Sequence, residues 1–236
     1  MGIKMKNLCT ICVRSGSKGV RNKNIKLMHG KPLIVYTIEQ AKSSKLFSQI
    51  TVSSDSDEIL KIAKKFDVDI LIKRDPSLCE DHSGKVDAIR DALLRSEDNL
   101  AITFDNVIDL DVTSPLRNAD DIVNSFKLFT KNNSDNLITG CMAKKNPYFN
   151  MVEIKKGQIQ YCKNSTQKPL SRQESPVVYE MNASIYIWKR EKLIKTNNLL
   201  GEKTSFFEMP EERSIDIDTE LDWEIVSGLM KKKICL

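Results

Sequence analysis

Short apolar runs alternate with amphipathic segments through the first part of the chain. Apolar runs of strand length lie at 8–13, 50–53, 69–72, 106–112 and 137–140. The segments between them carry apolar residues three or four positions apart, which predicts helices over about 32–45, 55–66, 84–96 and from about 119. Strands that alternate with helices form a parallel sheet covered on both faces. We therefore predict an α/β fold that binds its ligands beyond the carboxyl ends of the strands.

The pattern changes after about residue 142. Two runs around Lys156-Gly157 predict a β-hairpin over 151–162, and a polar, irregular segment follows. Further on, 184–188 predicts a strand and 190–196 a short helix, and 213–226 predicts a strand that runs into a helix. The expected buried face of that last helix comprises Leu221, Ile225, Val226 and Leu229. We interpret 1–236 as one domain in which 142–178 is an inserted lobe.

A glycine-containing cationic loop follows the first predicted strand. Arg14 ends the apolar run, and two glycines (Gly16 and Gly19) and further cations follow before Asn24. Glycine lets the backbone approach an oxyanion closely, while arginine and lysine neutralise its charge, so the loop is suited to phosphates. The spacing of its glycines fits neither a Walker loop nor a dinucleotide fingerprint. An ordinary basic surface loop remains the alternative.

Two Asp-x-Asp pairs stand at the ends of predicted strands, Asp109/Asp111 and Asp216/Asp218. Residues two apart on an extended chain point to the same side, so each pair can present two carboxylates together. Two carboxylates beside a triphosphate suit Mg²⁺. Aspartate is also a common helix N-cap, and Asp218 could instead cap the helix that begins near Thr219.

The cationic loop closely resembles the nucleotide loop of the CMP-sialic acid synthetases (N-acylneuraminate cytidylyltransferases), which reads Arg-x-x-Ser-Lys-Gly, four further positions and then Lys-Asn. The matching residues here are Arg14, Ser17, Lys18, Gly19, Lys23 and Asn24. The resemblance implies that these residues bind the triphosphate of CTP. It also implies a mostly parallel, doubly wound nucleotidyltransferase sheet with a small β-hairpin lobe that exchanges with a second subunit in a homodimer.

Two further segments carry the same resemblance. Asp216-Ile-Asp-Thr-Glu-Leu-Asp222 is similar to the family's terminal signature, whose first two aspartates bind the metal. This implies Asp216 and Asp218 as ligands of Mg²⁺, for which Mn²⁺ can substitute. The 113–117 segment also matches, but Asp111 replaces a glutamine associated with sugar contact. Asp111 is therefore a candidate either for a further metal ligand or for contact with a differently decorated sugar.

The remaining site residues are implied by the resemblance in the same way. A cation, amides and a phenol at short range suit a substrate with a carboxylate and many hydroxyls. The expected acceptor-binding residues are Asp111, Thr113, Ser114, Arg172, Gln173, Tyr179 and Asn182, and Arg74 is expected near the cytosine. The expected catalytic residues are Arg14, Lys18, Lys23, Asp216 and Asp218.

The resemblance implies a CTP-dependent cytidylyltransferase that activates a nonulosonic acid of the sialic, legionaminic or pseudaminic type and releases pyrophosphate. A CMP-legionaminic acid synthetase is one member that would fit. Two alternatives remain open. A nucleotide-sugar glycosyltransferase would use Asp109-Leu-Asp111 as its metal-binding motif, and a non-catalytic nucleotide-binding module would need no chemistry at all.

Composition limits the binding partners and the cellular compartment that we expect. The net charge of +5 is small for 236 residues and its cations are scattered among acidic residues, so we expect no nucleic-acid partner. The six cysteines lie mostly in apolar runs and lack the spacing of a zinc site. Cys9 and Cys12 should point to opposite faces of their strand. The sequence shows neither a signal peptide nor a transmembrane run, and we expect a cytoplasmic protein with no membrane partner.

Overall fold

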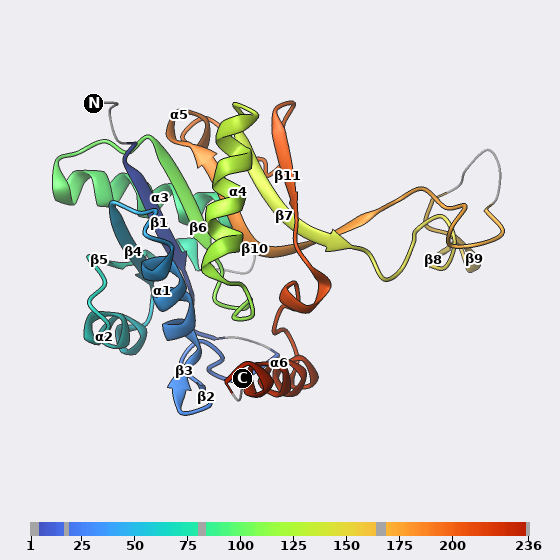
Figure 1. Cartoon of the computed structure of the whole chain (residues 1–236), viewed down its shortest axis with the longest axis horizontal. Coiled ribbons are helices and arrows are strands. Elements are labelled where there is room, and N and C mark those ends of the chain that lie inside the picture. The colour runs from blue at the N-terminus through green and yellow to red at the C-terminus, as the bar shows by residue number, and fades with distance from the viewer. Residues whose placement is uncertain (1–4, 17–18, 80–83, 164–168, 235–236) are drawn as a thin grey trace.

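The central feature of the fold is a seven-stranded sheet in the order β11-β7-β10-β6-β1-β4-β5 (Figure 1). The computed structural model describes residues 5–16, 19–79, 84–163 and 169–234. The sheet strands are β1 (Asn7–Cys12), β4 (Gln49–Ser54), β5 (Ile70–Lys73), β6 (Asn106–Leu110), β7 (Asn136–Met142), β10 (Tyr179–Lys189) and β11 (Thr204–Glu208). β10 runs antiparallel to both of its neighbours, and the other pairs are parallel. The predicted α/β fold with a mostly parallel sheet is confirmed, although β11 was not predicted.

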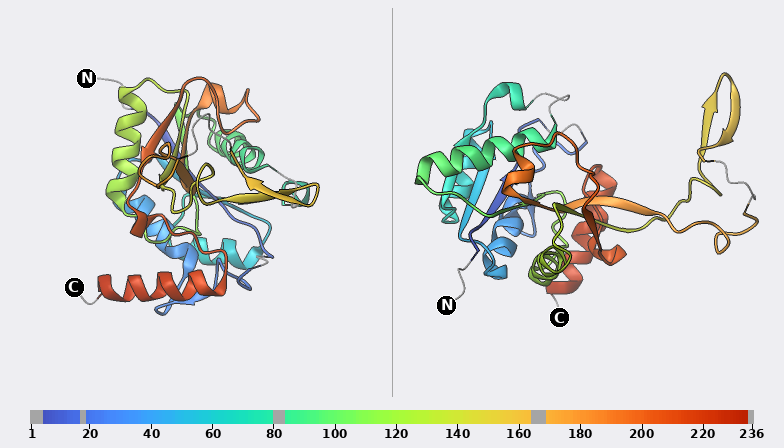
Figure 2. Two further views of the ribbon diagram at one scale, coloured as in Figure 1. Left: turned by 90° about the vertical axis from the view of Figure 1, so that its right-hand side faces the viewer. Right: turned by 90° about the horizontal axis from the view of Figure 1, so that it is seen from above.

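Helices cover both faces of the sheet (Figure 2). They are α1 (Leu33–Ser44), α2 (Asp57–Lys65), α3 (Lys85–Leu100), α4 (Ala119–Lys131), α5 (Arg190–Leu193) and α6 (Glu220–Ile234). The larger apolar core joins one face to α1, α2, α4 and α6, and a second core joins the other face to α3 and α5. Cys9 belongs to the first core and Cys12 packs against the second, so the prediction of opposite faces is confirmed.

A lobe projects from the sheet on two extended arms, which continue β7 and lead into β10 (Figures 1 and 2). At its base the Ala143 amide donates to the Val178 carbonyl over 3.0 Å. The lobe carries the antiparallel pair β8 (Val152–Lys155) and β9 (Gln158–Tyr161). Lys156 and Gly157 between them have φ angles of 51° and 78°, as a tight hairpin turn requires. The predicted hairpin is confirmed.

The helix predicted over 55–66 is α2, which is capped by Ser56, while the Asp55 carboxylate accepts a 2.7 Å hydrogen bond from the Ser15 amide. One local prediction was wrong. The chain before α6 forms no strand over 213–218, although those residues are described. It contains a 3₁₀ turn, η2 (Glu211–Arg213), followed by an irregular segment. A second 3₁₀ turn, η1 (Pro76–Leu78), follows β5.

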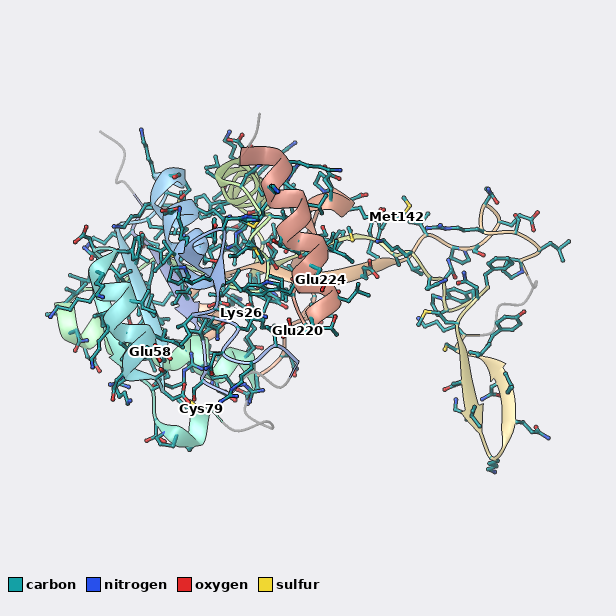
Figure 3. The ribbon with its side chains drawn as sticks, turned by 90° about the horizontal axis from the view of Figure 1, so that it is seen from below. Lys26, Glu58, Cys79, Met142, Glu220 and Glu224 are labelled. Atoms are coloured by element: carbon teal, nitrogen blue, oxygen red, sulfur yellow. The ribbon has the colours of Figure 1, made fainter. Side chains whose placement is uncertain are left out.

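The buried face of α6 also differs from the prediction. Val226 and Met230 are buried, whereas Leu221 and Ile225 are 66% and 43% exposed. The helix lies near the small antiparallel pair β2 (Leu27–Met28) and β3 (Lys31–Pro32). It is held there by Lys26, whose Nζ lies 2.8 Å from the Glu220 carboxylate and 4.5 Å from the centre of the Trp223 ring (Figure 3). The helix is therefore attached to the N-terminal part of the chain through polar contacts as well as through the core.

Candidate active site

The cationic loop is held in place from two sides as it leaves β1. Asp55, at the end of β4, accepts hydrogen bonds from the Ser15 amide and hydroxyl. The Asn24 amide group donates to the Arg14 carbonyl over 3.0 Å, and the Arg14 guanidinium donates to the Cys79 carbonyl over 3.1 Å. Gly16 has a φ of 75°, which glycine adopts without strain. Ser17 and Lys18, two of the predicted phosphate-binding residues, lie outside the described residues.

The far end of the loop lies directly against the segment that precedes α6. A β-carbon added to Gly19 would lie 1.7 Å from the Asp218 carbonyl oxygen, so only glycine fits there. Lys23 is 8% exposed, and its ammonium donates to the Ile217 carbonyl and lies 3.4 Å from the Asp218 carboxylate. The Ile217 amide in turn donates to the Thr113 carbonyl over 2.9 Å. Residues nearly 200 positions apart, 194 in the contact of Lys23 with Ile217, thus form one site at the carboxyl edge of the sheet.

Asp216 lies in the partly buried centre of this site. Its carboxylate accepts a hydrogen bond from the Ser114 hydroxyl. Burial raises the pKa of Asp216 to about 7, and the nearby negative charges of Asp111 and Asp218 contribute in the same direction. A carboxylate destabilised in this way gains from a cation beside it.

Asp218 does not cap α6, although its position in the sequence would allow it to. The cap of α6 is formed by Thr219 and Asp222: the Thr219 amide donates to the Asp222 carboxylate over 2.8 Å, and the Asp222 amide donates to the Thr219 hydroxyl over 3.2 Å. The Asp218 side chain is 78% exposed, with Lys23 as its neighbour. It is therefore available to a ligand at the site.

The oxygens of Asp216 and Asp218 fit the chemistry of Mg²⁺, which takes one or two protein carboxylates and completes its octahedron with phosphate and water. Among the described residues no group of three or more His, Cys, Asp or Glu side chains could hold a metal by itself. A metal at this site would therefore complete its coordination with water or with oxygens of a bound substrate.

The other acidic pair lies at the end of β6, beside a residue that the sequence analysis missed. Lys85, the first residue of α3, places its Nζ 2.6 Å from the Asp111 carboxylate and 3.3 Å from that of Asp109. Burial alone would raise the pKa of Asp111, but the charge and hydrogen bond of Lys85 outweigh it and lower that pKa to about 2. Asp111 also accepts from the amide and hydroxyl of Thr113, both over 3.0 Å. Lys85 stands alone in the sequence with no motif around it, so nothing there identified it.

The turn at 113–117 is fixed by a buried arginine. Arg117 is 2% exposed and donates to the Ser184 carbonyl over 2.6 Å and to the Gln40 side chain over 3.0 Å. Burial lowers the pKa of Arg117 to about 10. The arginine of this motif thus ties the turn to β10 and α1, and the turn in turn positions Ser114 against Asp216.

The predicted acceptor-binding residues separate into two groups. Asn182 is 2% exposed and lies near the site, where Thr139 donates to its oxygen over 2.7 Å and its nitrogen donates to Ser214 over 3.0 Å. Tyr179 packs its ring against Phe206. Arg172 and Gln173 are exposed on the arm that leads to the lobe, and the Arg172 guanidinium donates to the Ala143 carbonyl. Within a single chain these two residues do not join Asp216.

Arg74 lies at the same edge of the sheet, after β5. It is 5% exposed, and its guanidinium donates to the Ser53 carbonyl over 2.8 Å and to the Ser53 hydroxyl over 3.1 Å. These contacts hold the ends of β4 and β5 together next to the cationic loop. The position is compatible with the predicted neighbourhood of a nucleotide base.

Comparisons with known proteins find similarity along almost the whole chain. The family described as "Cytidylyltransferase" matches residues 8–233. The "Post-translational flagellin modification protein B" of Campylobacter coli is 46% identical over 96% of this chain and 95% of its own length. The "CMP-N,N'-diacetyllegionaminic acid synthase" of Campylobacter jejuni is 45% identical over the same shares of the two chains.

Among solved structures, a CMP:2-keto-3-deoxy-manno-octonic acid synthetase complexed with CTP matches with a TM-score of 0.70 and 16% identity, over 97% of this chain and 99% of that one. At this identity the likeness shows the fold alone. Within the described residues, no helix has both the length and the apolar character needed to cross a membrane.

Proposed function

Because the chain belongs to the cytidylyltransferase family, we propose that it transfers the cytidylyl group of CTP to a nonulosonic acid and releases pyrophosphate. The observation that carries this proposal is the contact of the cationic loop with the Asp216–Asp218 segment. This contact brings basic groups of the loop and two carboxylates together. This is the arrangement that a nucleoside triphosphate requires.

We propose an acceptor of the legionaminic type. The support is the 45% identity with the synthase of that name over nearly the whole of both chains. Asp111, at the position where glutamine is common in sialic acid synthetases, is consistent with an acceptor that carries different substituents. The Asp111 carboxylate can accept hydrogen bonds from acceptor hydroxyl or amide groups.

In the proposed reaction the anomeric hydroxyl of the acceptor attacks the α-phosphorus in line. A new oxygen–phosphorus bond forms, the bond to the bridging oxygen of the β-phosphate breaks, and the hydroxyl proton is released. Mg²⁺ at Asp216 and Asp218 would offset phosphate charge and lower the pKa of the attacking hydroxyl. Arg14 and Lys18 would neutralise the departing pyrophosphate.

Lys23 would act on the same phosphates while it holds the Ile217 carbonyl, so it also keeps the two aspartates in position. Most of the catalysis would come from positioning and charge neutralisation. Mn²⁺ should substitute for Mg²⁺, since both take oxygen ligands.

We also propose a homodimer. The β8–β9 hairpin exposes Ile154 and Ile159 by 75% and 74%, an apolar surface that favours a protein partner. In a dimer, Arg172 and Gln173 on the projecting arm would serve the site of the second subunit. Light scattering coupled to gel filtration should give twice the 26.9 kDa of one chain, and Ile154→Glu/Ile159→Glu should give a monomer.

We propose a cytoplasmic location, because five cysteines among the described residues are unpaired, as in a reducing compartment. A cytoplasmic location also fits the proposed substrate and product, because CTP and the CMP-sugar are charged and would be retained there.

A pyrophosphate-release assay tests the proposed function. The purified protein is incubated with CTP, Mg²⁺ and each of N,N'-diacetyllegionaminic, pseudaminic and N-acetylneuraminic acid, and the products are identified by mass spectrometry. We expect pyrophosphate and a CMP-sugar in equal amounts, with the fastest turnover on the legionaminic acid. Controls lacking acceptor, or with ATP in place of CTP, should release no pyrophosphate.

Two other outcomes would contradict the proposal. Turnover of a ready-made nucleotide sugar but not of CTP would indicate a glycosyltransferase. The contacts disfavour this, because the Lys85 ammonium already lies between the carboxylates of Asp109 and Asp111, on which a glycosyltransferase would depend. CTP binding without turnover of any sugar acid would indicate a nucleotide-binding module.

A further inference from the structure

Lys85 occupies a cation site built into the end of β6. Its Nζ lies 2.6 Å from the Asp111 carboxylate and 3.3 Å from the Asp109 carboxylate. The same Nζ lies 4.5 Å from the centre of the Tyr186 ring, whose face also favours a cation. One ammonium thus touches both carboxylates of an Asp-x-Asp pair, where a bound divalent ion would otherwise bridge them.

Asp109 depends on this ammonium. The residue is 1% exposed, and one of its carboxylate oxygens accepts a 2.9 Å hydrogen bond from the Thr10 hydroxyl. The other oxygen is buried and accepts no hydrogen bond from the described residues. Its compensation comes from the charge of Lys85. Because one of its buried oxygens accepts no hydrogen bond, the Asp109 carboxylate needs the cation at 3.3 Å in order to stay ionised.

In the second Asp-x-Asp pair no single ammonium reaches both carboxylates. Lys23 pairs with Asp218 over 3.4 Å and also donates to the Ile217 carbonyl. Within the described part of the chain, Asp216 forms no ion pair, and a neutral hydroxyl, that of Ser114, is its hydrogen-bond donor. The two pairs have the same spacing, but only the first has an ammonium between its two carboxylates.

We propose that the Lys85 ammonium takes the place of a divalent cation between Asp109 and Asp111, so that the carboxylates of this protein hold one metal ion, at Asp216 and Asp218. The inference rests on the proposed function in taking Asp216 and Asp218 as the metal ligands. It goes further in assigning the number of protein-held ions and in excluding Asp111 from the ligands. Lys85 is then a positioning residue, which directs the metal to one of two similar sites.

The test is a titration of the full chain with Mn²⁺ alone, followed by electron paramagnetic resonance, in the absence of CTP and acceptor. Wild-type protein should bind one ion, and Asp216→Asn should lose it. Lys85→Met should bind two ions, because the vacated space between two carboxylates attracts a cation. Lys85→Met/Asp111→Asn should return to one. No substrate is present, so the result does not depend on the reaction.

Three controls separate the inference from loss of structure. Lys85→Arg keeps the charge and should bind one ion. Lys31→Ala removes another ion-paired lysine, one that contacts Glu39 outside this site, and should also bind one. If Lys85→Met fails to fold, Asp111→Asn in the wild-type background still decides, since it should still bind one ion. Two ions in the wild type, one or none in a folded Lys85→Met, or loss of the site in Asp111→Asn would overturn the proposal.

Discussion

The two Asp-x-Asp pairs have the same spacing but opposite environments. Asp109 and Asp111 lie at the end of a sheet strand and share the ammonium of Lys85. Asp216 and Asp218 lie on an irregular segment, where burial and neighbouring carboxylates raise the pKa of Asp216 to about 7. We call the first pair compensated and the second uncompensated, because one ammonium lies between both carboxylates of the first, whereas Lys23 pairs with only Asp218 of the second. The same spacing therefore occurs in two different electrostatic environments.

The largest expected effect comes from breaking the uncompensated pair. Asp216→Asn or Asp218→Asn should lower turnover by at least about 100-fold while the protein remains folded, because the metal that would contact the phosphates loses a protein ligand. The measurement is Mg²⁺-dependent pyrophosphate release alongside a circular-dichroism melt.

Asp222→Asn is the matched control, since it removes the same charge four residues from Asp218 but affects the α6 cap. It should cost about 1 kcal/mol of stability and keep most of the turnover. Equal losses of activity in all three variants would mean that the segment has only a structural role.

Breaking the compensated pair should instead cost stability. Lys85→Met leaves Asp109 buried without its cation, and the free energy of unfolding should fall by about 3 kcal/mol. Urea denaturation of the wild type and the variant measures this loss. Adding Asp109→Asn to the variant should recover part of the stability, because the buried charge is gone. A variant as stable as the wild type would show that Lys85 contributes nothing to the first pair.

The pairs should also respond to pH in opposite directions. Between its ordinary pKa of 3.8 and its raised value of about 7, Asp216 holds a proton in the folded chain that the unfolded chain has lost. Its contribution to stability is therefore present at low pH and lost as the pH rises through 7. Asp111, with its pKa lowered to about 2, contributes stability that is present above 3.8 and lost as the pH falls toward 2.

The measurement is the melting temperature of metal-free protein from pH 5 to 8. Asp216→Asn should reduce the decline toward pH 8, and Mg²⁺ with CTP should stabilise the wild type more at pH 8 than at pH 6, since the metal needs the ionised carboxylate. Identical pH profiles of the wild type and Asp216→Asn would contradict the raised pKa.

The smallest effect on stability should come from the exposed contacts that hold α6, the helix that follows Asp216 and Asp218. Lys26→Ala removes an ion pair with Glu220 and a cation–π contact with Trp223. Both partners of the ion pair are partly exposed, so the expected loss is below about 1 kcal/mol, with a modest rise in the Mg²⁺ concentration needed for activity. A loss as large as that of Lys85→Met would indicate that α6 depends on Lys26 more than on its apolar core contacts.

Elements of the fold could be predicted from the sequence where the spacing of the apolar residues matches the face of the strand or helix that is buried. The run at 8–13 became β1, and 84–96 became most of α3, because each pattern is fulfilled by packing against one sheet. β11 was missed because its pairing with β7 is a long-range contact. The segment at 213–218 was wrongly predicted as a strand. It lies against the cationic loop and does not pair with the edge of a sheet strand.

Part of the candidate site could also be predicted from the sequence, and part could not. Gly19, Lys23 and Asp218 could be singled out from their motifs, and the structure brings these residues together even though Asp218 lies on an irregular segment. Lys85 could not be found from spacing, because it reaches Asp111 from the start of α3, 26 positions earlier in the chain. The charge on a pair is thus a tertiary property that local patterns do not contain.

The most direct test of the central claim is a crystal structure of the protein soaked with CTP and Mn²⁺, with the anomalous signal of manganese located. We predict manganese at Asp216 and Asp218, the triphosphate against the 14–24 loop, and no manganese at Asp109 and Asp111. Manganese bound between Asp109 and Asp111, or a triphosphate away from the loop, would contradict it.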